Sequence, residues 1–157
     1  MRRIILIIAV VLPLSLSAQI PAIEQLGKEA KRQRGVEYES VGSLMLGLAS
    51  TFAAKDQRAT FEMLDNIDMI TCTNSSYTPT LRARAQAVVE SIGATYLDST
   101  EDDKARSVVY AIKQEKVVKE LIILTEGKDG GYAVVVMSGT IPEERLEEIS
   151  KLSPPHK

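Results

Sequence analysis

Carboxylates are the side chains of this sequence that come nearest to forming a chemical site. Two groups lie close together in the chain, Asp65 with Asp68 and the successive acids Glu101, Asp102 and Asp103. Paired carboxylates perform acid–base chemistry when their surroundings push the two pKa values apart, and a calcium loop presents its ligands at alternating positions. Three successive acids lack that alternation and are typical of a solvated turn. Neither group therefore predicts a catalytic or metal-binding site.

Nucleophilic chemistry has little support in the sequence. A serine or cysteine nucleophile needs a base within hydrogen-bond reach, and the single histidine is His156, in the C-terminal PPHK. Cys72 lies in the apolar stretch IDMITCT, which predicts a small buried side chain. We predict no catalytic residue, no cofactor and no metal ligand, so a hydrolase is the least favoured hypothesis.

Two short motifs invite a more specific interpretation. The glycines of Gly127–Gly131 lie between two predicted strands and lack the lysine–serine/threonine ending of a phosphate loop, so they predict a hairpin turn. Asp98-Ser99-Thr100 resembles the acceptor motif for O-linked glycans on exported bacterial proteins, and it lies at a predicted strand end. Ser99 is therefore a candidate modification site.

The N-terminus has the three parts of a secretory signal. Arg2 and Arg3 precede the apolar run Ile4–Leu12, and small residues follow before Gln19. The run is too short for a membrane span, which needs about 20 apolar residues. We predict cleavage after Ala18, with Ser17 as the alternative, and a protein that is exported to the periplasm or secreted with no membrane span after cleavage.

Composition narrows the possible partners. The formal net charge is −2, and cleavage would remove two arginines, so the chain lacks the clustered positive charge of nucleic-acid-binding proteins. No linker divides the remaining residues, which predicts one domain over residues 19–153 and a disordered tail over 154–157.

Apolar periodicity and breaker residues predict the elements that would position any site. Helices are predicted over 21–33, 43–52 and 78–92 and from Pro142, and strands over 36–41, 67–73, 95–99, 107–113, 117–125 and 132–138. The order predicts an α+β fold, a two-layer sandwich with a mainly antiparallel sheet, a meander of four strands in the C-terminal half and helices packed on one face. The early β–α–β segment also permits a right-handed parallel crossover.

The second predicted helix carries the most marked apolar pattern near the N-terminus. Leu44, Leu48 and Phe52 form one stripe with Met45 and Ala49 beside it, and we expect this stripe in the core. The polar residues 55–60 that follow are expected to form a loop.

Three stretches carry a resemblance to a known family. They are VEYESVGSLML (Val36–Leu46), the apolar strand Ile67–Cys72, and KELIILTEGKDGGYAVVVMSGTIPEERLEEISKL (Lys119–Leu152). Together they resemble the family described as domain of unknown function 4252, small exported proteins of Bacteroidetes. The resemblance implies export, one domain and a place in the bacterial envelope, and it supplies no catalytic residue. Many relatives carry a lipoprotein cysteine, which this chain does not have.

The leading functional hypothesis is a non-catalytic binding or protein-interaction module of the cell envelope, whose partner is another envelope protein. The alternative is a carrier of a small apolar ligand in a pocket between helices and sheet. Met45, Met63, Met69 and Met137 would line that pocket, because methionine adapts to varied shapes.

Overall fold

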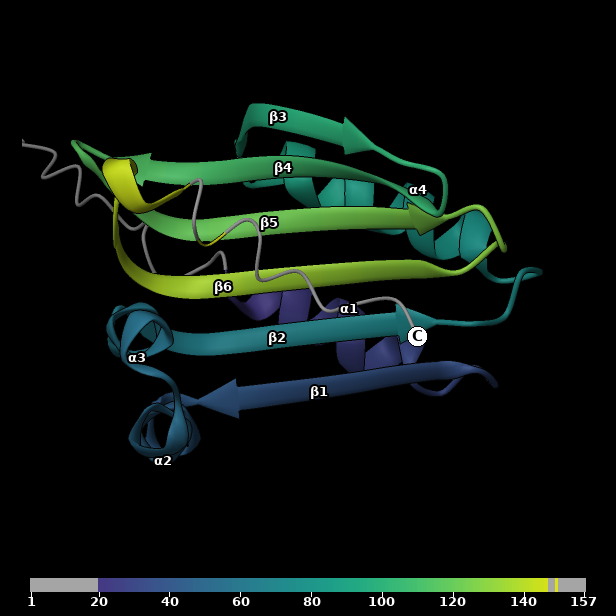
Figure 1. Cartoon of the computed structure of the whole chain (residues 1–157). Coiled ribbons are helices and arrows are strands. Elements are labelled where there is room, and N and C mark those ends of the chain that lie inside the picture. Colours follow the sequence, from purple (N-terminus) through teal and green to yellow (C-terminus); the bar gives the residue numbers. More distant parts are fainter. Residues whose placement is uncertain (1–19, 147–148, 150–157) are drawn as a thin grey trace, which may run out of the picture.

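The computed structural model describes residues 20–146 and 149 of the chain. Within these residues six strands form one antiparallel sheet in the order β1-β2-β6-β5-β4-β3, accompanied by four α-helices (Figure 1). The elements are α1 (Ile20–Ala30), β1 (Val36–Gly42), α2 (Ser43–Phe52), α3 (Lys55–Glu62), β2 (Leu64–Cys72), α4 (Thr78–Ser91), β3 (Thr95–Glu101), β4 (Ala105–Gln114), β5 (Val117–Gly127) and β6 (Tyr132–Pro142). The chain is an α+β domain, as predicted.

The sheet topology contains no parallel crossover between β1 and β2, although the order of the predicted elements permitted one. β1 pairs antiparallel with β2, so that Val36 lies opposite Cys72, and β2 pairs antiparallel with β6. The reason is α3, which occupies the residues expected to form a polar loop. Two helices between β1 and β2 return the chain to the end of the sheet that it left (Figure 1). In the C-terminal half β3, β4, β5 and β6 pair in chain order, each antiparallel to the next.

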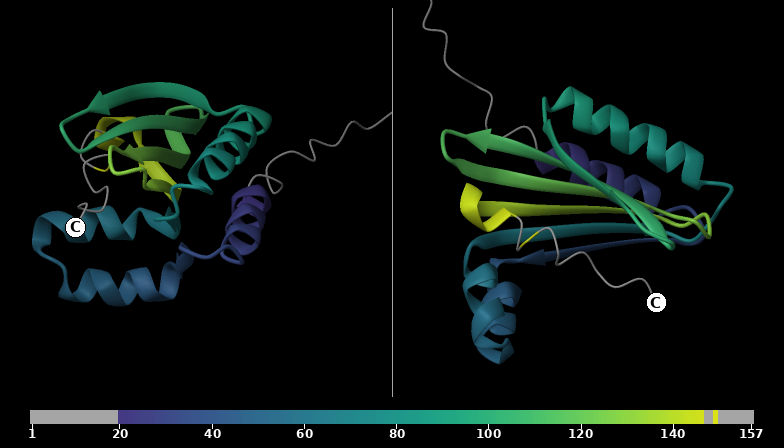
Figure 2. Two further views of the ribbon diagram at one scale, coloured as in Figure 1. Left: turned by 90° about the vertical axis from the view of Figure 1, so that its right-hand side faces the viewer. Right: turned by 45° about the horizontal axis from the view of Figure 1, so that its top comes forward.

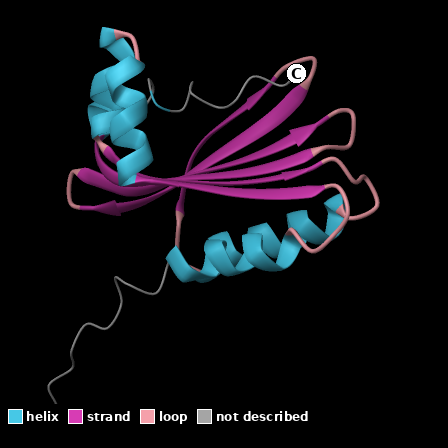
Figure 3. Cartoon of the chain, turned by 90° about the horizontal axis from the view of Figure 1, so that it is seen from below, coloured by secondary structure: helices cyan, strands magenta, loops and turns pink. Residues whose placement is uncertain are grey.

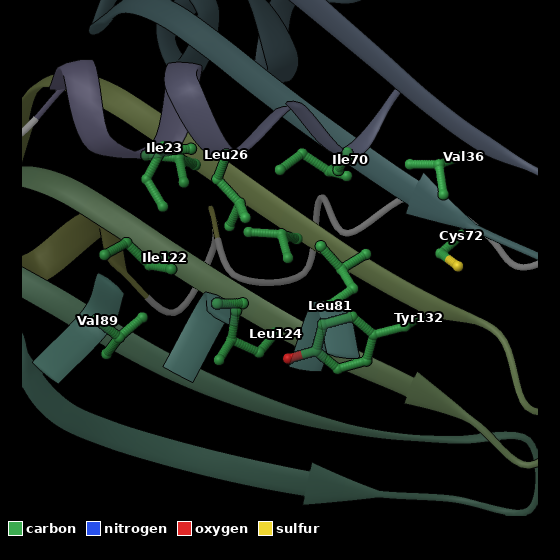
Figure 4. Packing of buried hydrophobic residues seen from close by; sticks show 14 residues of the cluster. Ile23, Leu26, Val36, Ile70, Cys72, Leu81, Val89, Ile122, Leu124 and Tyr132 are labelled. Carbon is green, nitrogen blue, oxygen red and sulfur yellow. The ribbon is translucent and has the colours of Figure 1, made fainter. Parts of the chain in front are cut away.

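Helices α1 and α4 cover one face of the sheet, which we call the helix face (Figure 4). Ile23 and Leu26 of α1 and Leu81 and Val89 of α4 pack with the strand residues Ile70, Cys72, Ile122, Leu124, Val134 and Val136. Each fully buried aliphatic side chain of this kind contributes about 1.5–3 kcal/mol. This layer is therefore the main apolar core around the centre of the sheet.

The opposite face of the sheet has a second apolar cluster, because successive strand side chains point to opposite faces. Leu121, Ile123, Val135 and Met137 alternate with the residues of the helix face, and Leu46 of α2 packs against them. The hairpin of α2 and α3 stands at one end of the sheet on this side, whereas α1 and α4 lie on the other side (Figures 2 and 3). The expectation that the helices share one face is thus not met.

Three further predictions concern the glycine-rich turn, the C-terminal helix and the two ends of the chain. The glycine-rich segment forms the β5–β6 hairpin, as predicted, with Gly130 at a φ of 87°. Of the predicted last helix, the described part has a 3-10 turn at Glu143–Arg145 and a buried Ile149. Cleavage after Ala18 and the tail 154–157 concern residues outside the described part of the chain.

Candidate functional site

The outward face of α2 is an apolar stripe exposed to solvent. Leu44 is 79%, Met45 59%, Leu48 52% and Phe52 89% exposed. We call these four residues the α2 stripe. The prediction that they lie in the core is wrong, because Leu46 alone among the α2 residues is buried against the body of the protein. An amphipathic pattern indicates which face of a helix is apolar but not what covers that face.

The local sequence explains how the stripe is held outward. Arg58 of α3 donates from Nε to the carbonyl oxygen of Ser50 at 3.1 Å, which fastens α3 to the C-terminal turn of α2. On the inner side, Leu46 and Phe61 pack into the second apolar cluster. The hairpin is therefore anchored by its inner residues and presents the stripe on its outer side. Contiguous exposed apolar patches on soluble proteins commonly mark interaction sites.

A second candidate site lies on the helix face, where three buried polar residues come from neighbouring strands. Asp68 of β2 is 3%, Glu120 of β5 6% and Ser138 of β6 7% exposed. We call these three residues the acidic pocket. Ser138 is the cross-strand partner of both Asn66 in β2 and Glu120 in β5. The central strand β6 thus places the serine between the two carboxylate-bearing strands.

Hydrogen bonds satisfy one carboxylate of the pocket but not the other. Tyr38 donates its hydroxyl to Oδ1 of Asp68 at 2.8 Å, and Asn66 donates Nδ2 to Oδ2 at 2.6 Å. Among the described residues, no side chain or backbone group donates a hydrogen bond to the Glu120 carboxylate, and the Oγ of Ser138 is buried without a partner.

The surroundings of the pocket raise the pKa values of two of its acidic groups. Burial raises the pKa of Glu120, and the negative charge of Asp68 raises it further. Burial and then the hydrogen bond to Asp68 raise the pKa of Tyr38 to about 12. These shifts agree in direction, because excess negative charge in a partly dry site disfavours a further anion.

Asp68 belongs to a carboxylate group, as its sequence position suggests, but its partner in the fold is not Asp65. Asp65 is exposed at an irregularity of β2 between Leu64 and Asn66, and the buried carboxylate nearest to Asp68 in the sheet is Glu120. The alternation of side chains along a strand contains this information. Asp68 lies two residues from the buried Ile70 and Glu120 lies two residues from the buried Ile122, so each carboxylate lies on the same face as an apolar core residue. A charged residue at an apolar-face position of a predicted strand therefore predicts a buried polar site of this kind.

The other predicted residues are scattered over the fold. Cys72 is buried at 2% exposure, as predicted. Ser99 is exposed on β3, where its Oγ accepts a hydrogen bond from the Tyr96 hydroxyl at 3.1 Å; its glycosylation stays a prediction. Asp102 lies in an exposed turn, where its Oδ1 accepts from the backbone nitrogen of Lys104 at 2.7 Å.

Three of the four methionines of the proposed apolar pocket are brought together, and the fourth is not. Met63, Met69 and Met137 contribute to the second apolar cluster, whereas Met45 points outward in the α2 stripe. In the part of the chain that the structure describes, no three residues of the types His, Cys, Asp or Glu gather as a metal site would require. Likewise, none of the described helices combines the length and apolar character that crossing a bilayer would need. His156 lies outside the described residues.

These features define an α+β domain with a helical hairpin that projects an apolar stripe and with a buried acidic pocket on the opposite face. The family described as "Domain of unknown function (DUF4252)" matches residues 31–149, which include the α2 stripe and the acidic pocket. The chain belongs to this family. No curated protein and no solved structure matches the chain.

Proposed function

We propose that the protein is a non-catalytic interaction module of the bacterial cell envelope, which binds another envelope protein through the α2 stripe. The main support for this proposal is the exposure of the stripe, above all of Phe52 at 89% and Leu44 at 79%. Leu44, Leu48 and Phe52 recur at every fourth position, so they lie along one side of the helix. Anchors with this spacing are typical of helices that insert into a groove on a partner.

The chemistry of α2 specifies the kind of partner. Residues 43–54 contain no charged side chain, so a matching groove must be apolar and uncharged. A second copy of the chain offers a poor match in two described grooves. The groove between α1 and α4 contains the Glu29–Arg84 ion pair, and the groove beside the β5–β6 turn contains Arg106 and Lys128. A different protein is therefore the favoured occupant.

A bilayer surface fits α2 less well than a protein groove. Helices that lie in a membrane interface carry lysine and arginine on their polar face. The residues beside the stripe are instead Ser43, Gly47 and Thr51. The proposed place in the envelope is supported by the predicted signal sequence of residues 1–18, which favours export to the periplasm or secretion.

The proposal is tested by photo-crosslinking in the cells that make the protein. A photoreactive phenylalanine analogue replaces Leu48 at the centre of the stripe, and in a matched control it replaces Gln57, which is exposed on α3. We expect one defined adduct with a different protein from the Leu48 position and none from Gln57. Adding Phe52→Ser should reduce the yield about tenfold, because buried aromatic anchors dominate such interfaces.

Other outcomes reject the proposal and identify the alternative. An adduct between two copies of this chain would assign the stripe to self-association. Adducts with lipid would assign it to a membrane surface. Equal adducts from Leu48 and Gln57, or no adduct from either, would remove the stripe as a docking surface.

A further inference from the structure

The acidic pocket is not explained by an interaction through the α2 stripe, because the two lie on opposite sides of the sheet. Burying two carboxylates near each other is unfavourable unless positive charge or hydrogen-bond donors compensate. Asp68 has two donors, from Tyr38 and Asn66. Glu120 has none among the described residues, although it is only 6% exposed. The pocket therefore has an excess of negative charge and a shortage of donors.

Ser138 provides an independent observation at the same place. Its side chain is 7% exposed, and its Oγ has no hydrogen-bond partner in the described chain. It has the same strand parity as Val136, which packs on the helix face, and it lies directly across from Glu120. Neighbouring strands are about 4.8 Å apart, so the serine oxygen and the Glu120 carboxylate can reach one ligand between them.

The acceptors in the pocket indicate the class of ligand. Two carboxylates and a hydroxyl provide three oxygen-bearing groups from three strands, and a primary ammonium group has three N–H donors and no acceptor. Calcium takes six to eight oxygen ligands, and magnesium demands a near-ideal octahedron, which these three side chains alone do not provide. We propose that Asp68, Glu120 and Ser138 form a binding site for a primary ammonium group.

Two sources could provide this chemistry. One is an amine from outside the chain, such as a small amine or a lysine side chain of a partner. The other is the α-amino group that cleavage after Ala18 would create, one residue before α1 begins at Ile20. Helix α1 lies on the same face of the sheet as the pocket (Figure 1). Both sources supply the same chemical group, and the experiment distinguishes them.

The test follows the Glu120 carboxyl carbon by NMR in the exported form of the protein, beginning at Gln19, and in the same form with an acetylated α-amine. Acetylation removes the terminal charge. Methylammonium is the probe. Tetramethylammonium, which has the same charge but no N–H, is the matched control. An outside amine is indicated if methylammonium gives saturable Glu120 shifts in both forms. The chain's own α-amine is indicated if the acetylated form alone responds.

Substitutions test whether methylammonium binds at the three residues of the acidic pocket. Glu120→Gln and Ser138→Ala should each weaken methylammonium binding about tenfold, since each removes one partner of a charge-assisted hydrogen bond. Asp65→Asn, an exposed carboxylate on the same strand as Asp68, should leave the binding unchanged. At one methylammonium concentration, the thermal unfolding temperature should rise in the responsive form and rise less in the two pocket variants.

Three results would overturn the site. Glu120 could be insensitive both to methylammonium and to acetylation. Tetramethylammonium could act as strongly as methylammonium, which would show charge screening only. Calcium could saturate the pocket at lower concentration than methylammonium, which would replace the ammonium site with a metal site. None of these results depends on whether the α2 stripe binds a partner.

Discussion

At the scale of single residues, Glu120 links the stability of the fold to pH. Burial and the charge of Asp68 raise its pKa above the ordinary value of 4.5, so the folded chain binds this proton more tightly than the unfolded chain. The resulting stabilisation is fully present below pH 4.5 and is lost as pH rises through the folded-state pKa. Above the ordinary pKa of a glutamate, the buried Glu120 side chain therefore reduces the stability of the folded chain.

The neutral isostere Glu120→Gln should remove this penalty. In the acetylated protein without added amine, we expect the variant to be more stable than the wild type at pH 7 by about 1 kcal/mol, the scale of free energy that a moderately raised pKa represents, because the amide removes the buried negative charge. Urea unfolding at several pH values measures the difference, which should shrink toward pH 4.5. Asp65→Asn is the exposed control. Equal stability of Glu120→Gln and wild type at every pH would contradict the explanation.

At the scale of elements, α2 contains both a buried residue, Leu46, and an exposed residue of the proposed docking stripe, Leu48. Leu46 is 2% exposed and packs into the second apolar cluster, whereas Leu48 is 52% exposed. Leu46→Ala should cost about 2 kcal/mol or more, because it leaves a cavity. Leu48→Ser should change stability by no more than about 0.5 kcal/mol, as exposed positions do. Chemical unfolding of both variants checks the pair, and a large loss from Leu48→Ser would show that the stripe is covered.

The same two helices show where sequence patterns stop being informative. The apolar spacing of α2 predicts a helix, as observed. The same spacing occurs in helices that pack in a core and in helices whose apolar side is exposed, so it does not predict the burial of the stripe. α3 was predicted as a loop because 55–60 has no apolar stripe. It is held instead by single inward residues, the buried Thr60 and the half-buried Phe61, and by the contact of Arg58 with α2.

At the scale of the whole molecule, the sequence predicted the α+β class, the order of the strands along the chain and the β5–β6 hairpin. It did not predict that β1 and β2 run antiparallel, because that depends on α3, whose helical state is set by tertiary contacts. The acidic pocket was missed for a similar reason. Asp68 and Glu120 are far apart in the chain and lie on one face of the sheet because β6 pairs with both β2 and β5.

The distribution of burial predicts how stability varies across the fold. β5 and β6 lie inside the sheet and contribute side chains such as Ile122 and Val134, both 0% exposed, to its core. Their amide hydrogens should exchange only through global unfolding, whereas α2, with one buried residue, should exchange through local opening of much lower free energy. Hydrogen exchange read out by mass spectrometry on the purified protein measures both regions, and α4, which packs along the sheet, is an internal helical control.

Protection of α2 equal to that of β5 and β6 would mean that the isolated chain already covers the stripe by self-association. Protection of α2 that appears only when the crosslinked envelope partner is added would place that partner on the stripe.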